Sequence, residues 1–378
     1  MNTPAERLET FSKRLSEAKT DSAVVSDPRH ILYFTGFMTS KPRINSILRV
    51  DASGKGEGSV LFVGRSEEAP ARRAFPGRVE VYQDYDLQKS MITYPDAFSR
   101  LVGGALKGRG GTGGTVGIEE WHLPQVFLSA LEGRKVGISR TILSMRRRKG
   151  ADEVADHVEA AKRLDRAYRV AAGYPKAGRT ELQLYRRVNG SYFEREGQPE
   201  TWRHSDVLGD FVSGERTLEI GGPPTERRMR RGDTLIMDLQ NLCNGHWADT
   251  ARTMLVGLAR PTARQERIFE TLLRAKREAE GILRPGTKGG EVYGVVARTI
   301  TEAGFDPLPH HAGHGIGLDS QEAPFFIPGS QDVIQEGDVC AVEPGIYDRE
   351  AGGMRIEDNY AITEKGFEKV SRFPISLA

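Results

Sequence analysis

The sequence predicts a two-domain protein, in which a smaller α/β domain precedes a larger α+β domain that contains an internal pseudo-repeat. The chain has 378 residues, more than one ordinary hydrophobic core accommodates, so two domains are expected. Strand-like and helical segments alternate in the N-terminal part, which is typical of an α/β domain. A long helical segment then opens a second region in which one sequence pattern occurs twice.

The N-terminal domain is expected to begin with an amphipathic helix within the first 20 residues. Leu8, Phe11 and Leu15 recur there at the spacing of one helical face. A second helix is expected over residues 96–106. Four strand-rich runs complete this domain: residues 22–37, residues 44–63 with a glycine turn inside, residues 114–120 and residues 134–139.

We place the domain boundary after residue 148, which gives domains 1–148 and 149–378. Asp152 and Glu153 put acidic side chains in the first turn of a long helix that we expect to stop at Pro175, and their charge suits the helix dipole. The pseudo-repeat follows this helix. The segments GRTELQLY and GTKGGEVY each come after a long helix and begin another, which suggests a duplicated unit packed on a common sheet.

The composition is typical of a soluble globular protein. The formal net charge of +2 argues against a dedicated nucleic-acid or membrane-surface binder. The first residues lack the apolar core of a signal peptide, and no apolar run approaches membrane-spanning length, so we expect a cytoplasmic protein. Two cysteines without CxxC spacing indicate neither a disulfide framework nor a thiolate zinc site. The basic clusters 146–149 and 227–231 are interpreted as solvated surface.

The strongest local signal is a predicted β-hairpin around Asn244-Gly245, two residues that suit the positive φ angles of a type I′ turn. A two-residue turn pairs Gln240 with Asp249 and places Asp238 and Asp249 on one face as diagonal neighbours. Two carboxylates on a half-buried face require a proton or a cation between them. The alternative is one aspartate at a strand edge and an aspartate–arginine ion pair that involves Arg252.

Two further segments carry candidate ligands. His314 lies between glycines in HHAGHGIGLD, where the backbone can approach a site closely. Glu343 and Glu357 are expected on two strands joined by a glycine turn, each in apolar surroundings, so each carboxylate needs a partner. Four carboxylates and one imidazole form a hard donor set that suits two divalent ions, with manganese, cobalt or zinc as candidates. Such a site would hydrolyse a substrate through a metal-bound hydroxide.

The motifs MDLQ…GHWADTART, GHGIGLD, VEPGIY and MRIED resemble the M24 metallopeptidases, the family of methionine aminopeptidase, aminopeptidase P, prolidase and creatinase. This resemblance implies a C-terminal pita-bread fold, and SDPRHILYFTGF and VGIEEWHLP resemble the creatinase-type N-terminal domain. It also implies a homodimer and roles for the five residues. Asp249 and Glu357 would bridge the two metals. Asp238 would complete the coordination of one ion, and His314 and Glu343 would complete that of the other.

The resemblance implies further site residues as well. Glu343 would also orient or deprotonate the attacking water, His310 would lie near the substrate, and Arg355 would support the site. Proline-specific relatives carry two histidines where this chain has Gly221 and Gln321. Gln321 can still donate a hydrogen bond but cannot shuttle a proton.

Several replacements for the two absent histidines are open. His246 is one candidate, and the segment with Lys41, Arg43 and Asn45 is another. Our first hypothesis for the function is a prolidase-like hydrolysis of Xaa-Pro dipeptides. The alternatives are an aminopeptidase P acting on longer peptides, an amidase for small non-peptide amides on the same metal pair, and a pseudoenzyme or nucleic-acid-binding relative.

Overall fold

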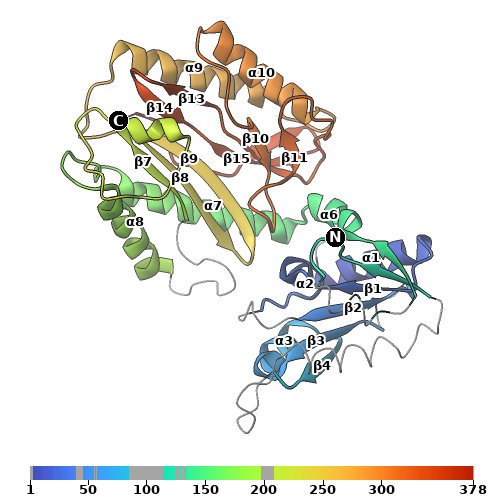
Figure 1. The fold of residues 1–378 in the computed structure, drawn as a ribbon. Coiled ribbons are helices and arrows are strands. Elements are labelled where there is room, and N and C mark those ends of the chain that lie inside the picture. The colour runs from blue at the N-terminus through green and yellow to red at the C-terminus, as the bar shows by residue number, and fades with distance from the viewer. Residues whose placement is uncertain are drawn as a thin grey trace. The chain divides into compact units, whose positions relative to one another are not determined.

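The computed structural model describes residues 3–39, 46–84 apart from 55 and 57, 114–123, 128, 131, 133–196 and 208–377. The chain divides between Arg146 and Arg147 into two compact units, which are described separately below (Figure 1). The helix expected over residues 96–106, and the segment with Lys41, Arg43 and Asn45, lie outside the described residues. Within the described residues, no helix combines the length and the apolar character that crossing a membrane requires.

The N-terminal unit is built on a mixed sheet with the strand order β4-β3-β2-β1-β5-β6. Pairing is parallel for β3 with β4, β1 with β5 and β5 with β6, and antiparallel for the others. The described strands are β1 (Ser22–Val25), β2 (Ile47–Asp51), β3 (Val60–Gly64), β4 (Arg78–Tyr82), β5 (Thr115–Ile118) and β6 (Arg134–Gly137). The described helices are α1 (Pro4–Glu17), α2 (Pro28–Thr35), α3 (Glu68–Ala74) and α6 (Ser139–Arg147). The predicted N-terminal helix and the predicted glycine-interrupted pair of strands are confirmed.

The second half of the first strand-rich run is a correction. Residues 22–25 form β1, but Pro28–Thr35 forms the helix α2. The Asp27 side chain caps this helix by accepting from Arg29 N at 2.9 Å, and Pro28 occupies its first turn. Gly36 ends it with φ 72°. These end signals outweigh the strand preference of the aromatic and branched residues between them.

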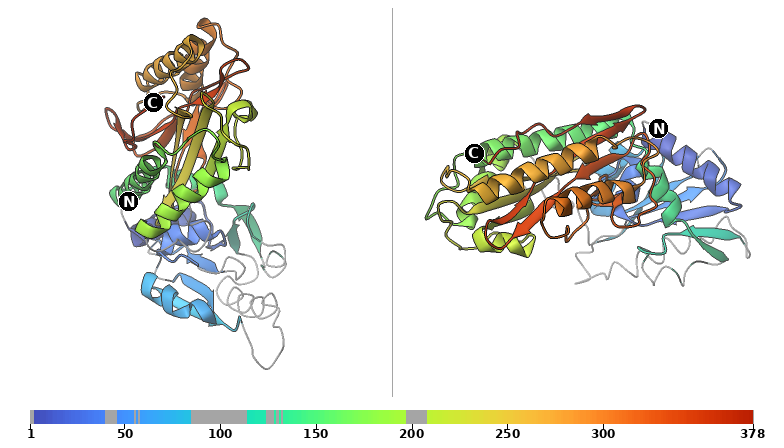
Figure 2. Two further views of the ribbon diagram at one scale, coloured as in Figure 1. Left: turned by 90° about the vertical axis from the view of Figure 1, so that its left-hand side faces the viewer. Right: turned by 90° about the horizontal axis from the view of Figure 1, so that it is seen from above.

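The C-terminal unit has helix pairs on either side of its strands (Figures 1 and 2). Helices α7 (Ala151–Ala171) and α8 (Glu181–Glu196) pack in one apolar core with β7 (Leu208–Ser213), β8 (Thr234–Cys243) and β9 (His246–Leu255). Helices α9 (Ala263–Glu280) and α10 (Gly289–Glu302) pack in another with β12 (Val339–Val342), β14 (Gly352–Arg355) and β15 (Asp358–Thr363). The remaining elements are η2 (Gly214–Glu219), β10 (Gly313–Gly315), β11 (Glu322–Phe326), β13 (Gly345–Asp348) and β16 (Gly366–Lys369). The strand orders are β7-β8-β9, β11-β10-β12-β15-β16 and β13-β14.

The predicted pseudo-repeat is visible in the backbone contacts of the two helix pairs. Gly178 and Gly286 precede α8 and α10, and both have a positive φ, 87° and 94°. Gly178 N donates to Met229 O and Gly286 N to Ile334 O, each at 2.9 Å. Each helix is therefore attached to an extended segment by an equivalent hydrogen bond, as a duplicated unit requires.

Candidate active site

The hairpin β8–β9 carries the two candidate aspartates. Asn244 and Gly245 form its turn with φ 48° and 84°. Gln240 pairs with Asp249, and Asp238 with Ala251, so the predicted register is confirmed. Because side chains alternate along a strand, Asp238 and Asp249 project from the same face, and Gln240 Nε2 donates to Asp249 Oδ2 at 2.7 Å.

The two candidate glutamates sit where strands end. The sequence predicts two strands here, but the structure has four: Glu343 follows β12, and Glu357 lies between β14 and β15. Pro344 supplies no N–H, so the β12 ladder stops there and β13 pairs with β14 instead. Glu343 N donates to Ala312 O at 2.9 Å, and Glu357 N donates to Ala251 O at 3.0 Å. These hydrogen bonds fix Glu343 beside the start of β10 and Glu357 beside the hairpin.

His314 lies in the middle of the short strand β10. A Cβ on Gly313 would lie 2.1 Å from Ala341 O, so the flanking glycine permits the close approach of the neighbouring strand. His314 Nδ1 lies 3.0 Å from Gly315 O, and because a carbonyl only accepts, Nδ1 carries the proton. His314 Nε2 is then a free acceptor, 3.4 Å from Glu343 Oε1 and 3.9 Å from the Asp249 carboxylate.

The structure brings the five candidate ligands together. Asp249, His314 and Glu357 form one group that could hold a metal ion, and Asp238, Glu343 and Glu357 form another; within each group the ligand atoms lie within 4.8 Å of one another. Asp238 Oδ1, Asp249 Oδ1 and both Glu357 oxygens are buried without a hydrogen-bond partner among the described residues. Buried carboxylate oxygens need such partners. The donor set and these oxygens fit divalent cations.

Electrostatics support the same conclusion. Burial, followed by the charges of neighbouring carboxylates, raises the pKa of Asp249 and of Glu357 well above the usual range. Burial would also raise the pKa of Glu343, but the hydrogen bond from His311 and the nearby imidazoles lower it. Burial lowers the pKa of His314, which favours the neutral form that binds metals. The group is thus short of positive charge, which divalent cations would supply.

A cavity of about 300 Å³ opens beside these ligands. Predicted site residues His310, Gln321 and Arg355 line it, together with four of the five candidate ligands. The other lining residues are Gly209, Asp210, Ile220, Gln240 and His311. The structure therefore brings all but one of the predicted site residues to one place.

His246 is the exception. It is three residues from Asp249 on β9, an odd spacing that turns its side chain to the opposite face. There His246 Nε2 lies 3.2 Å from Glu153 Oε1, and Nδ1 lies 3.4 Å from Asp156 Oδ2, both on α7. His246 does not line the cavity, and a contact with the substrate is not proposed for it.

Two predicted residues that line the cavity, Arg355 and His310, are joined by a chain of hydrogen bonds through Tyr347, which sequence reasoning missed. Arg355 Nη1 donates to the Tyr347 hydroxyl at 3.1 Å, and this hydroxyl lies 2.8 Å from His310 Nε2. His310 Nδ1 donates to His311 O at 2.7 Å, and burial lowers the pKa of His310, which favours the neutral form whose Nε2 accepts from Tyr347. His311, which also lines the cavity, has its Nδ1 2.7 Å from Glu343 Oε1. The cluster HHAGH was a signal for His311, and the motif VEPGIY was a signal for Tyr347.

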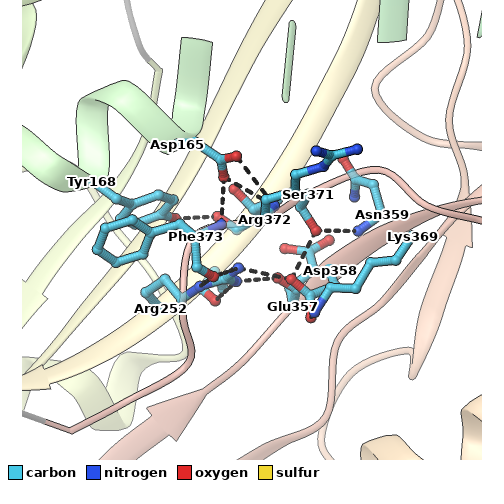
Figure 3. A network of polar contacts seen from close by, with 12 residues as sticks. Asp165, Tyr168, Arg252, Glu357, Asp358, Asn359, Lys369, Ser371, Arg372 and Phe373 are labelled. Carbon is cyan, nitrogen blue, oxygen red and sulfur yellow. Dashed lines mark hydrogen bonds and ion pairs between the residues drawn. The ribbon is translucent and has the colours of Figure 1, made fainter. Parts of the chain in front are cut away.

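A buried polar network holds the backbone behind Glu357 (Figure 3). Arg252, only 1% exposed, donates to Glu357 O, to Ala251 O at 2.8 Å and to Asp358 Oδ1 at 2.7 Å. It also donates to Phe373 O at 2.7 Å. Arg252 therefore pairs with Asp358 rather than with an aspartate of the hairpin, and it joins the β9 backbone to the residue that begins β15.

Comparisons with known proteins agree with this fold. The model of Metallopeptidase family M24 matches residues 155–364, and that of the Creatinase/Prolidase N-terminal domain matches residues 7–148. The chain belongs to metallopeptidase family M24, which confirms the pita-bread fold expected for its C-terminal part. The family is metal-dependent.

Individual relatives are similar over the whole chain. An uncharacterized peptidase of Staphylococcus saprophyticus is 26% identical over 97% of this chain and 99% of its own. The solved prolidase of Pyrococcus furiosus is 26% identical, with a TM-score of 0.80 over 96% of this chain and 99% of that one. The X-Pro aminopeptidase of Thermotoga maritima shares the fold at 22% identity, with a TM-score of 0.81 over 100% and 99%.

Proposed function

We propose that this chain hydrolyses the peptide bond that precedes proline in short peptides, with two divalent metal ions at the site. The observation that carries the proposal is the set of five converging ligands, which includes buried oxygens of Asp238, Asp249 and Glu357 that have no hydrogen-bond partner among the described residues. The similar solved proteins, a prolidase and an X-Pro aminopeptidase, support proline as the specificity element.

Asp238, Asp249, His314, Glu343 and Glu357 would hold the ions, with Asp249 and Glu357 shared between them. Manganese is the first candidate, because the donor set is rich in carboxylate oxygen, and cobalt and zinc are alternatives. When bound, such ions polarise a carbonyl group and lower the pKa of water.

The protein's own residues orient the reaction. Glu343 accepts the proton of the attacking water, a role that requires hydrogen-bond reach, and His311 holds the Glu343 carboxylate in place through its contact at 2.7 Å. His310 and Arg355 position the substrate in the cavity, and the Tyr347 hydroxyl fixes both side chains by hydrogen bonds.

The test is hydrolysis of Xaa-Pro substrates by the manganese-loaded protein. Leu-Pro and leucyl-prolinamide carry the same scissile bond, and the matched peptides Leu-Ala and leucyl-alaninamide lack proline. We expect cleavage of at least one proline substrate, little cleavage of the alanine pair, and loss of the activity in Asp249→Asn. No cleavage of either proline substrate would refute the proposal.

A further inference from the structure

The side chain of Asp210 fills the space next to Gly221, where proline-specific relatives carry a histidine. A Cβ built on Gly221 would lie 2.0 Å from Asp210 Oδ2 and 2.6 Å from its Cγ. Gly221 does not have a positive φ, so its backbone does not require glycine. The Asp210 carboxylate therefore excludes a side chain at position 221, and an acid faces the cavity at this place.

Asp210 is held firmly in this position. Its Oδ1 accepts from Gly222 N at 2.8 Å, and its Oδ2 accepts from Arg355 Nη2 at 2.7 Å. Asp210 lies on β7, where it pairs with Asp238 on the neighbouring strand β8. The carboxylate is thus a fixed part of the cavity wall and does not swing freely.

Arg355 is the only arginine or lysine among the described residues that line this cavity, and its terminal nitrogens are occupied. Nη2 lies 2.7 Å from both Asp210 Oδ2 and Asp238 Oδ2. Nη1 donates to Ile220 O at 2.8 Å and to the Tyr347 hydroxyl at 3.1 Å. Arg355 therefore offers no bidentate face to a further carboxylate.

A dipeptide Xaa-Pro brings a free carboxylate on its proline, whereas a longer peptide or an amide brings a neutral carbonyl and N–H. Burying an unpaired carboxylate is costly, and a neighbouring acid adds repulsion. A sphere with the volume of this cavity is about 8 Å across, and two like charges at that distance lower an equilibrium constant roughly thirtyfold at an effective dielectric constant of 20. Gln321, which also lines the cavity, is a neutral amide that can donate to a carbonyl or accept from an N–H.

We propose that Asp210 is a specificity-determining residue that selects substrates whose proline carboxyl group is masked, in a longer peptide or as an amide, over free Xaa-Pro dipeptides. This inference rests on the proposed cleavage before proline. It specifies the part of the substrate that follows the cleaved bond, namely a proline whose carboxyl group is masked. It favours the longer-peptide activity among the alternatives that the sequence left open.

The experiment compares kcat/KM for leucyl-prolinamide and Leu-Pro, two substrates that differ only in this group, with manganese-loaded protein. We expect the wild type to favour the amide at least tenfold. Asp210→Asn keeps the shape of the side chain and removes its charge, and it should shift the ratio toward the dipeptide by about tenfold. Glu219→Gln is the matched control, because Glu219 carries an exposed carboxylate at the end of η2, which follows β7, and does not line the cavity. This variant should leave the ratio unchanged.

The outcomes separate the two proposals. A wild type that cleaves Leu-Pro as fast as the amide, or an Asp210→Asn variant with an unchanged ratio, overturns the role of Asp210 and leaves cleavage before proline intact. A Glu219→Gln variant that shifts the ratio as much as Asp210→Asn overturns that role as well. Absence of cleavage of both substrates refutes the proposed function and, with it, this inference.

Discussion

Replacing Arg252 by leucine removes the cation at the centre of the buried network behind Glu357 (Figure 3). The side chain is 1% exposed and bonds to Asp358 and to the carbonyls of Ala251, Glu357 and Phe373. Removing one partner of a buried ion pair costs about 3–5 kcal/mol. The carbonyls left without their donor add to this loss, and the lysines that also contact Asp358 reduce it.

We therefore expect Arg252→Leu to lower the free energy of unfolding by about 4 kcal/mol, near the middle of that range. For a unit of this size, this corresponds to a fall in Tm of roughly 8–16 °C. Calorimetry of the metal-free protein measures the change. Arg264→Leu is the control, because Arg264 also pairs with an aspartate, Asp348, but its side chain is 45% exposed, and its removal should leave the free energy of unfolding nearly unchanged. Equal losses in the two variants would refute the account of the network.

Two further predictions concern the site itself. Because burial raises the pKa of Asp249 and of Glu357 above the unfolded values, the stability that these two carboxyls contribute to the metal-free protein should fall as pH rises above about 4, whereas the lowered pKa of His157 and of His314 acts in the opposite direction. Denaturation of the wild type and of Asp249→Asn at pH 5 and pH 8 tests this, because the variant should gain stability relative to the wild type at pH 8, and an equal change in both proteins would contradict it. Tyr347→Phe removes the hydroxyl between His310 and Arg355. It should lower kcat/KM roughly 10–100-fold and leave the manganese content unchanged. A variant with wild-type kinetics would show that this hydroxyl does not position His310 and Arg355 for the reaction.

Features set by local sequence were predictable. The Asn244-Gly245 turn fixes the register of β8 and β9, and this register alone places Asp238 and Asp249 on one face. The alternation of side chains along a strand would also have excluded His246 from the site. An odd spacing from Asp249 places its side chain on the opposite face of β9. For α2, the capping pair Asp27-Pro28 was the available signal, but the branched and aromatic residues after it suggested a strand.

Features set by contacts distant in sequence were not predictable in the same way. Glu343 and Glu357 could be recognised as ligands by their motifs, but the break between β12 and β13 depends on which strand each segment pairs with. The Asp210 carboxylate occupies the space that a side chain at position 221 would need. This contact depends on how the segment between the two residues folds. The contact of Tyr347 with His310 joins residues from two different segments of the unit.

The measurement that tests the central claim most directly is the titration of manganese into the metal-free protein by isothermal titration calorimetry. It gives the number of manganese ions that bind to each chain. We predict two ions per chain, and fewer in Asp249→Asn and in Glu357→Gln, whose carboxylates would be shared. His246→Gln serves as the control, because His246 contacts Glu153 and Asp156 on the opposite face of β9, and it should bind two ions. A wild type that binds no manganese, or an Asp249→Asn variant that binds it like the wild type, would contradict the account.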